Sequence, residues 1–225
     1  MNLERCEVLL GKNNLESIIN KNILIVGIGG VGGYTLESLV RMGIKNITIA
    51  DYDVIDSTNL NRQIISNIKN VGTKKTDAAY IRYTLINPDL NLLLIDKKLT
   101  IENFDALINK KYDYIIDACD DINIKVLLIK YAINNNIKII SSCGTAKRID
   151  ATKLKISTLD KTEYDPLAKK LRQSLRKDKI NLKIPVVYST ETPINCNKLG
   201  SVSYVPAVAG LLITSYVIND IISFK

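Results

Sequence analysis

The chain has 225 residues, 46% of them hydrophobic, which is enough for the core of one large α/β domain and excludes a disordered chain. It carries 31 lysines and arginines against 23 acids, a net charge of +8, and it has no histidine, which excludes Ser-His-Asp triads and imidazole metal sites. The four cysteines form no CxxC pair and the N-terminus has no apolar signal-peptide core, so we expect a cytoplasmic protein without a structural zinc site.

The first predicted unit runs from Ile23 to Asp53: a buried strand, a glycine cluster, a helix and a second strand that ends in acid. In such a unit the backbone N–H groups of the turn approach phosphate at the N-terminus of the helix. We therefore predict a nucleotide site that includes Gly27, Gly29, Gly30 and Gly32, with Asp51 accepting hydrogen bonds from ribose hydroxyls. The alternative is a tight turn in an ordinary parallel sheet, and the presence here of five of the chain's 11 glycines argues against it.

Helices and strands then alternate along the chain. Helices are predicted at 74–86, 101–108 and 123–134, and strands at 92–95, 112–118 and 137–142. This alternation predicts an α/β fold with a doubly wound, mainly parallel sheet of Rossmann type, whose ligands bind outside the C-terminal ends of the strands. The side chains at those ends, which we expect to share one crevice, are Asp51, Asp53, Asp117, Asp120 and Ser142. Asp53 is also typical of a turn, and Asp117 of a structural cap or of a residue behind a ligand.

After Ile149 the pattern changes, without an internal repeat or a clear linker. The elements predicted here are a half-exposed strand at 154–159, a basic helix at 165–179, strands at 185–190 and 201–205, and a buried helix that starts near Pro206. We interpret residues 1–225 as a single domain, with a core of about 20–150 and a substrate-binding extension at 151–225. The uncharged stretch 199–219 is long enough for a membrane span, but its small and polar residues favour burial in the protein, so membrane association is the minor alternative.

Two basic motifs follow the second strand, STNLNRQ at 57–63 and VGTKK at 71–75. A polyphosphate carries several negative charges that must be neutralised as a leaving group departs. Arg62 offers a planar fork for bidentate contacts, and Lys75 offers a mobile point charge. Asp120 is placed like a magnesium-binding acid. Each charge alone is also typical of a solvated surface, but together they favour an enzyme that cleaves a triphosphate over a dinucleotide dehydrogenase.

Five motifs, GIGGVG, DYD, STNLNRQ, VGTKK and DACD, occur in this order. Together they resemble, over about residues 5–150, the adenylyltransferase family of ubiquitin-activating enzymes and its bacterial relatives in molybdopterin and thiazole synthesis. The resemblance implies ATP and Mg²⁺, with the metal at Asp120, and a homodimer in which Arg5 reaches the partner subunit's site. The catalytic residues that it implies are Arg62, Lys75, Asp120 and Arg5. The nucleotide contacts that it implies include Asp51, Asn59, Arg62, Gln63 and Lys75, with Lys74 as the exposed neighbour.

A narrower resemblance spans nearly the whole chain. The segments RCEVLLGKNNLESI, GTAKRIDATKLKISTLDKTEYDPLAKKLR and VVYSTETP are similar to the tRNA threonylcarbamoyladenosine dehydratases, a branch of this family, while the CxxC pairs of the molybdopterin and thiazole relatives are missing. The resemblance implies that ATP adenylates the threonyl carboxylate of a modified adenosine beside the tRNA anticodon. A nucleophile within the carbamoyl-threonyl group then closes on the activated carbonyl and expels AMP, with net loss of water. The connection at 193–199 is shorter than in some relatives, which leaves its substrate contacts open.

The implied partner is tRNA that carries threonylcarbamoyladenosine. The net charge and a cluster of eight lysines and arginines between residues 161 and 183 favour RNA independently, because basic clusters supply the sequence-independent part of nucleic-acid affinity. One alternative is an enzyme that adenylates the C-terminal glycine of a ubiquitin-like or sulfur-carrier protein, and a docked sulfur-transfer protein also stays open. Another is a dinucleotide-binding oxidoreductase. We predict that no cysteine is catalytic, although Cys196 lies in a polar, exposed context.

Overall fold

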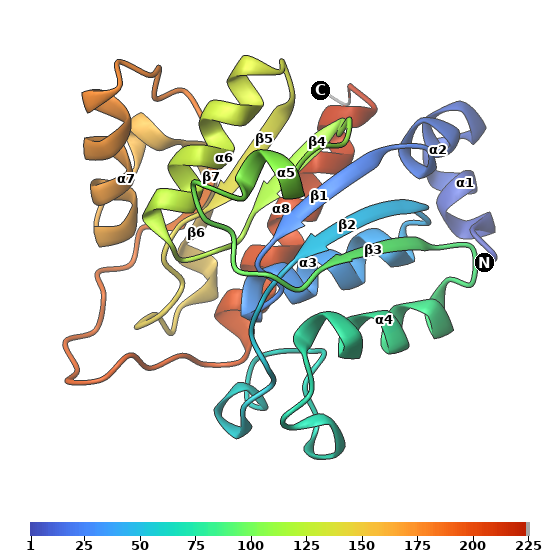
Figure 1. Ribbon diagram of the computed structural model, residues 1–225, viewed down its shortest axis with the longest axis horizontal. Coiled ribbons are helices and arrows are strands. Elements are labelled where there is room, and N and C mark those ends of the chain that lie inside the picture. The colour runs from blue at the N-terminus through green and yellow to red at the C-terminus, as the bar shows by residue number, and fades with distance from the viewer. Residues whose placement is uncertain (224–225) are drawn as a thin grey trace.

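The computed structural model describes residues 1–223, and its strands form one seven-stranded sheet (Figure 1). The strands are β1 (Asn22–Val26), β2 (Asn46–Ala50), β3 (Asn91–Ile95), β4 (Tyr114–Asp117), β5 (Lys138–Ser142), β6 (Leu154–Thr158) and β7 (Pro185–Ser189). They lie in the order β3-β2-β1-β4-β5-β7-β6, and the neighbours are parallel except for β6 and β7. The predicted α/β class with a doubly wound, mainly parallel sheet is confirmed.

Helices cover both faces of the sheet (Figure 1). They are α1 (Glu4–Leu10), α2 (Lys12–Ile19), α3 (Gly30–Arg41), α4 (Lys75–Ile86), α5 (Phe104–Leu107), α6 (Ile122–Asn134), α7 (Pro166–Lys177) and α8 (Tyr204–Ile221), with 3₁₀ turns at Ser57–Asn59, Ile68–Asn70, Ala151–Lys153 and Leu159–Lys161. One core joins the sheet to α2, α3, α4 and α8, and the other joins it to α5, α6 and α7. Along β1, Ile23 and Ile25 enter the first core and Leu24 and Val26 the second, as expected of a strand buried on both faces.

The order in which the chain adds strands to the sheet reverses between β1 and β4. The chain first builds outward from β1 to β2 and β3, and then returns to start the other half at β4. Ligands of such sheets bind at this switch point, outside the C-terminal ends of the strands. Val26 pairs with Asp117 in the parallel register, so the chain leaves β1 and β4 side by side. The glycine cluster after β1 and the DACD motif of β4 therefore meet.

The C-terminal extension continues the same sheet, with β7 between β5 and β6. The strand predicted at 201–205 is wrong, because α8 already begins at Tyr204. Val205 is part of this helix and is buried in the first core. The helix predicted at 101–108 is reduced to the single turn of α5.

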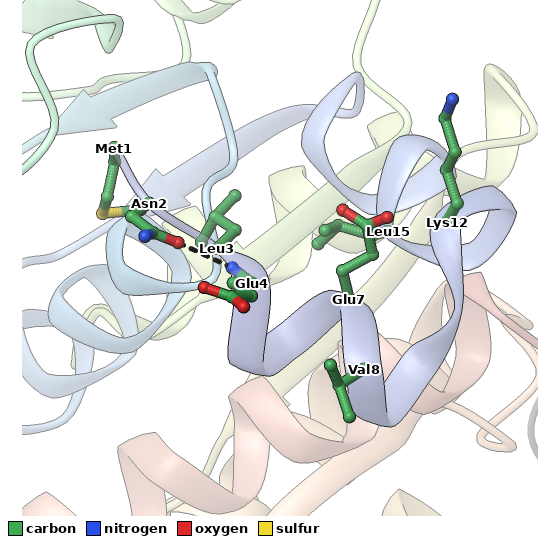
Figure 2. Close-up of a pocket in the computed structure, with 8 residues that line it drawn as sticks. All are labelled: Met1, Asn2, Leu3, Glu4, Glu7, Val8, Lys12 and Leu15. Atoms are coloured by element: carbon green, nitrogen blue, oxygen red, sulfur yellow. Dashed lines mark hydrogen bonds between the residues drawn. The ribbon is translucent and has the colours of Figure 1, made fainter.

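Two helices that we did not predict precede β1 and lie on the right in Figure 1. α1 buries no residue, so its sequence lacks the apolar stripe by which a helix is recognised. A hollow of about 590 Å³ adjoins α1 and α2 (Figure 2), and it is lined by Met1, Asn2, Leu3, Glu4, Glu7, Val8, Lys12 and Leu15. Since β1 starts directly after α2, these helices lie at the N-terminal edge of the sheet, opposite the switch point.

α8 lies against α3 and the sheet. The side chains of Val205, Ala209, Ile213 and Val217, at intervals of four residues, are fully buried in the first core. Within residues 1–223, α8 is the one helix long and apolar enough to cross a membrane, but half of that stretch is buried inside the protein. This packing agrees with the prediction of a buried helix, since a core helix has the same composition.

The contact between α3 and α8 yields a prediction for stability. A Cβ on Gly210 would lie 2.4 Å from the Val31 carbonyl oxygen and 3.0 Å from the Thr35 amide nitrogen. Alanine favours a helix by about 1 kcal/mol over glycine, but overpacking against backbone atoms costs about 1–3 kcal/mol. We expect Gly210→Ala to lower the free energy of unfolding, measured with urea, by about 1–2 kcal/mol. Gly200→Ala, which meets no atom within 4 Å, is the control; equal stability of both variants would contradict this packing.

Candidate active site

The glycine turn after β1 has no room for side chains. Gly27 has a φ of +84°, and a Cβ on Gly32 would lie 1.8 Å from the Gly27 carbonyl oxygen. α3 starts at Gly30, and no side chain caps it at Gly29. The first N–H groups of α3, at the positive end of the helix dipole, therefore remain available to an anion such as phosphate.

The Asp51 side chain is hydrogen-bonded to this turn. Its Oδ2 accepts a hydrogen bond from the Ile28 amide at 2.8 Å, and its Oδ1 accepts one from the Asp53 amide at 3.0 Å. Burial raises the pKa of Asp51, and the Lys75 ammonium, whose Nζ lies 3.9 Å from Oδ1, opposes that rise. The carboxylate thus lies between the glycine turn and a cation.

Lys75 is the buried member of two neighbouring lysines. It is 5% exposed, and its Nζ lies 2.6 Å from Asp53 Oδ2. Lys74 is exposed, as the resemblance implies, and pairs with Asp96. Asp53 is therefore more than a turn residue, because its carboxylate holds the Lys75 ammonium at the crevice. A phosphate bound at the turn would compete with Asp53 for this ammonium.

The segment after β2 brings Arg62 and Gln63 to the glycine turn. A Cβ on Gly30 would lie 3.7 Å from Arg62 Cγ, and a Cβ on Gly29 would lie 3.6 Å from Gln63 Nε2. Arg62 Nη1 donates to the Thr58 carbonyl oxygen at 2.6 Å, which orients the guanidinium. Gln63 is buried, and its Oε1 has no hydrogen-bond partner among the described residues.

Asn59 stabilises the turn that carries these two residues. Its Oδ1 accepts a hydrogen bond from the Asp56 amide at 3.1 Å, and Asp56 Oδ1 accepts one from the Thr58 amide at 2.8 Å. This reciprocal cap closes the 3₁₀ turn directly before Arg62. The side-chain oxygen of Asn59 is therefore occupied, and only its NH₂ group is left for the predicted phosphate contact.

Asp120 lies in the loop between β4 and α6. It is exposed, and within residues 1–223 its carboxylate has no ion pair or hydrogen bond. Burial raises the pKa of the Tyr52 phenol, and the charges of Asp53, Asp120 and Asp51 raise it further. Tyr52 therefore has carboxylates around it from the end of β2 and from the loop after β4. This arrangement places the free Asp120 carboxylate opposite Asp51 and Asp53, across the switch point.

A buried ion pair that we did not predict lies behind this loop. Asp117 and Lys125 are both fully buried, with 3.0 Å between Nζ and Oδ2. Lys125 also donates to Ser141 Oγ at 3.2 Å and to the Ser142 carbonyl oxygen at 2.8 Å, so all three ammonium protons are used. Asp117 Oδ1 accepts from the Cys119 thiol at 3.1 Å. Asp117 therefore lies beneath the crevice in a structural role, as the alternative for this residue allowed, whereas Ser142 lies there contrary to expectation.

The sequence signal for this pair was a lysine within the apolar run of α6, eight residues after Asp117. Lysine is seldom fully buried without a partner, so Lys125 on an apolar helix indicates a buried acid nearby. The pair joins β4, β5 and α6 at the base of the DACD loop. It fixes the end of β4, from which the loop carrying Asp120 extends.

The connection between β7 and α8, residues 190–203, borders the crevice. The Ile194 amide donates to the Lys147 carbonyl oxygen at 2.9 Å, and Lys147 Nζ donates to the Cys196 carbonyl oxygen at 2.7 Å. At its other end, Asn61 Nδ2 donates to the Ser201 carbonyl oxygen at 3.0 Å. The connection thus runs from the loop after β5 to the segment beside the glycine turn.

The cysteine environments do not favour a nucleophile. Burial raises the pKa of the Cys143 thiol, and burial together with the Asp117 carboxylate raises the pKa of the Cys119 thiol. Cys196 is exposed in the β7–α8 connection, where its thiol donates to the Lys198 carbonyl oxygen at 3.2 Å. Only a thiolate is strongly nucleophilic, so the two buried cysteines are poor candidates.

The structure does not bring Arg5 to the crevice of its own chain. It is exposed on α1, at the N-terminal edge of the sheet. The five residues of β1 span about 17 Å between that edge and the glycine turn. An arginine side chain cannot bridge that separation within one chain.

Comparison with known proteins agrees with this architecture. Residues 3–224 match the model of the ThiF family. The tRNA threonylcarbamoyladenosine dehydratase of Bacillus subtilis (strain 168) is 33% identical to the chain, over 97% of the chain and 93% of that protein. The crystal structure of the E. coli tRNA N6-threonylcarbamoyladenosine dehydratase in complex with AMP is similar with a TM-score of 0.92 and 34% identity, over 96% of this chain and 92% of that chain.

A more limited similarity extends to an adenylyltransferase and sulfurtransferase. The adenylyltransferase and sulfurtransferase UBA4 of Saccharomyces cerevisiae (strain YJM789) is 34% identical over 126 residues, which cover 56% of this chain and 28% of that protein. The similarity to the dehydratases therefore covers a much larger share of both chains. The chain belongs to the ThiF family, with the tRNA threonylcarbamoyladenosine dehydratases among its relatives.

Proposed function

We propose that this protein catalyses the ATP-dependent dehydration of threonylcarbamoyladenosine in tRNA, through an acyl-adenylate intermediate. The observation that carries the proposal is the charge arrangement at the switch point. An uncapped helix N-terminus, the cations Arg62 and Lys75 and the free carboxylate of Asp120 surround one turn. A hydride-transfer enzyme does not need these cations, whereas cleavage of a triphosphate does. The similarity of the whole chain to named dehydratases supports the same activity.

The chemistry can be assigned to the residues at the site. The threonyl carboxylate attacks the α-phosphorus of ATP, and the bond from that phosphorus to the bridging oxygen of pyrophosphate breaks. Arg62, Lys75 and the first N–H groups of α3 neutralise the charge that develops. A nucleophile within the carbamoyl-threonyl group then attacks the acyl carbonyl, and AMP leaves. The enzyme contributes positioning and charge, which suits a chain without histidine.

Magnesium fits this site through Asp120. Among the described residues no group of three acid or cysteine side chains could hold a metal alone. Mg²⁺ does not need such a group, because it takes one or two carboxylates and completes its shell with phosphate oxygens and water. When bound, it would supply charge neutralisation on the phosphates. Asp117 does not fit, since Lys125 and Ser141 occupy its carboxylate.

A homodimer would complete the site. Arg5 lies at the far edge of its own sheet, so its implied role requires the crevice of a second subunit. α1 is well suited to such a contact, because Val8 and Leu9 are 84% and 82% exposed. The hollow beside them, with Leu3 and Leu15 in its lining (Figure 2), adds apolar surface to the same region. Large apolar side chains that are exposed in one subunit are typical of subunit interfaces.

The second candidate is adenylation of the C-terminal glycine of a ubiquitin-like or sulfur-carrier protein. The match to UBA4 favours it, but that match covers little more than half of the chain. The chain has no CxxC pair for a zinc module, and its most buried thiols are poor acceptors. A sulfur-transfer partner and a cytoplasmic location remain predictions.

Exchange between ATP and labelled pyrophosphate separates the two functions. We expect exchange and AMP release with tRNA that carries threonylcarbamoyladenosine, and loss of one water from the modified nucleoside by mass spectrometry. tRNA that lacks the modification has no threonyl carboxylate to adenylate, so it should give no exchange. Exchange only with a carrier protein that ends in Gly-Gly would overturn the proposal in favour of the second candidate.

Asp120 and Asp117 should respond differently to the same substitution. Asp120→Asn removes the free carboxylate, so we expect adenylation to fall by about 100-fold or more, with an unchanged unfolding curve. Asp117→Asn leaves Lys125 buried without its counter-charge, so we expect the free energy of unfolding to fall by about 3 kcal/mol. Denaturant unfolding and pyrophosphate exchange measure the two effects. Similar changes in both variants would contradict the separate roles.

The shared site can be tested by mixing inactive subunits. Arg5→Ala and Lys75→Ala should each abolish most turnover, and an equal mixture after subunit exchange should regain about a quarter of wild-type activity, because each hybrid dimer has one intact site. A mixture of Lys75→Ala with Arg62→Ala is the control, since both residues lie in the same subunit's crevice and no hybrid site is intact. Recovery in neither mixture, with exchange verified by mass spectrometry, would exclude a contribution from the partner.

A further inference from the structure

The basic helix α7 begins at the edge of the crevice. Asp165 caps it by accepting from the Ala168 amide at 2.9 Å, and its other oxygen accepts from the Gly144 amide at 2.9 Å. Arg148 Nη2 donates to the Tyr164 carbonyl oxygen at 2.8 Å. Gly144 follows the C-terminal end of β5, so these contacts fix the start of α7 at the edge of the sheet where the switch point lies. From there the helix runs along the left side of the molecule in Figure 1.

α7 has two distinct faces. Ala168, Leu171 and Leu175 are buried in the second core together with residues of α6. The opposite face carries four exposed cations, Lys169, Lys170, Arg176 and Lys177. These cations form two pairs that are seven residues, or about 10 Å, apart along the helix. The helix therefore presents a row of positive charge to solvent, beginning near the crevice.

This charge is not neutralised within the described part of the chain. None of the four cations forms an ion pair there, and the nearby Asp178 pairs with Lys130 on α6. Asp165 is occupied by two backbone amides, as described above. For comparison, Lys21 pairs with Asp113 and Lys138 pairs with Asp220. The exposed face of α7 is thus a concentrated cationic surface that is available to bind an anionic partner.

A membrane does not fit this surface. A basic amphipathic helix binds a bilayer by inserting its apolar face between the lipids. In α7 that face is already used, because Leu171 and Leu175 are fully buried against α6. What remains is a row of cations on a rigid support, which suits an extended polyanion whose charges repeat along a backbone.

We propose that the exposed face of α7 docks the sugar-phosphate backbone of the RNA that flanks the substrate nucleoside. This inference rests on the proposed function and adds the surface by which the polymer is held. The nucleoside enters the crevice at the switch point, and the adjoining phosphates lie along Lys169, Lys170, Arg176 and Lys177. The β7–α8 connection is tied through Lys147 to the loop after β5, the same loop whose Gly144 amide holds the start of α7.

Two triple variants with the same change of charge test the surface. In the first, Lys169→Gln, Lys170→Gln and Lys177→Gln are combined on α7. In the second, Lys45→Gln, Lys110→Gln and Lys111→Gln are combined at the opposite edge of the sheet, where these exposed lysines precede β2 and β4. Binding of tRNA without the modification, measured by fluorescence anisotropy at several salt concentrations, reports docking independently of turnover. ATP binding by calorimetry verifies that both variants are intact.

We expect the α7 variant to bind tRNA roughly 30-fold more weakly at physiological salt, with a slope of log affinity against log salt that is smaller by about 2. With modified tRNA its KM should rise while kcat changes little, because the adenylation site is untouched. The control variant should resemble the wild-type protein. Equal tRNA affinity of the two variants would overturn the proposal, as would tighter binding of wild-type protein to phosphatidylserine vesicles than to tRNA. Docking without dehydration by the wild-type protein would instead refute only the proposed function.

Discussion

The close approach of two chain segments at the ends of β1 and β4 is the constraint on which the rest of the site depends. Val26 lies in register with Asp117, and a Cβ on Gly27 would lie 2.8 Å from the Ala118 carbonyl oxygen. This closeness brings the uncapped N-terminus of α3 next to the loop of Asp120. A polyphosphate and the acid that would hold its metal can therefore share one small space. Bulky side chains in the turn would force the two segments apart.

Two lysine–carboxylate pairs near this point do different work because their environments differ. Asp117 and Lys125 are fully buried and hydrogen-bonded, so the pair is a structural part of the fold. Removing one partner leaves the other as an unpaired buried charge. Lys75 pairs with the half-exposed Asp53, so this pair, unlike the first, is open to solvent on one side. The Asp117–Lys125 pair thus supports the loop that carries Asp120, whereas the Lys75–Asp53 pair lies on the side that is open to a ligand.

The functional surfaces of the molecule are separated by the length of the strands. The crevice lies at the C-terminal edge of the sheet, whereas α1, with exposed Val8 and Leu9, lies at the N-terminal edge. α7 starts at the crevice and extends along its flank. α1 and the start of α7 thus lie at opposite edges of the sheet. The continuous apolar strands of the sheet keep these surfaces at fixed distances.

The sequence by itself determined the sheet and the residues of the glycine turn, because tight turns, buried strands and amphipathic helices are set by local sterics and by the alternation of apolar residues. Local pattern failed in two places: α1 has no buried face by which its sequence could be recognised, and residues 201–205 lead into α8, whose Val205 packs in the first core, instead of forming a strand. The pairing of Lys75 with Asp53 was not predicted from the sequence, and Lys125 on the apolar α6 indicated a buried acid without identifying Asp117. Such pairs depend on how strands and helices come together in space, so only the tertiary structure could decide them.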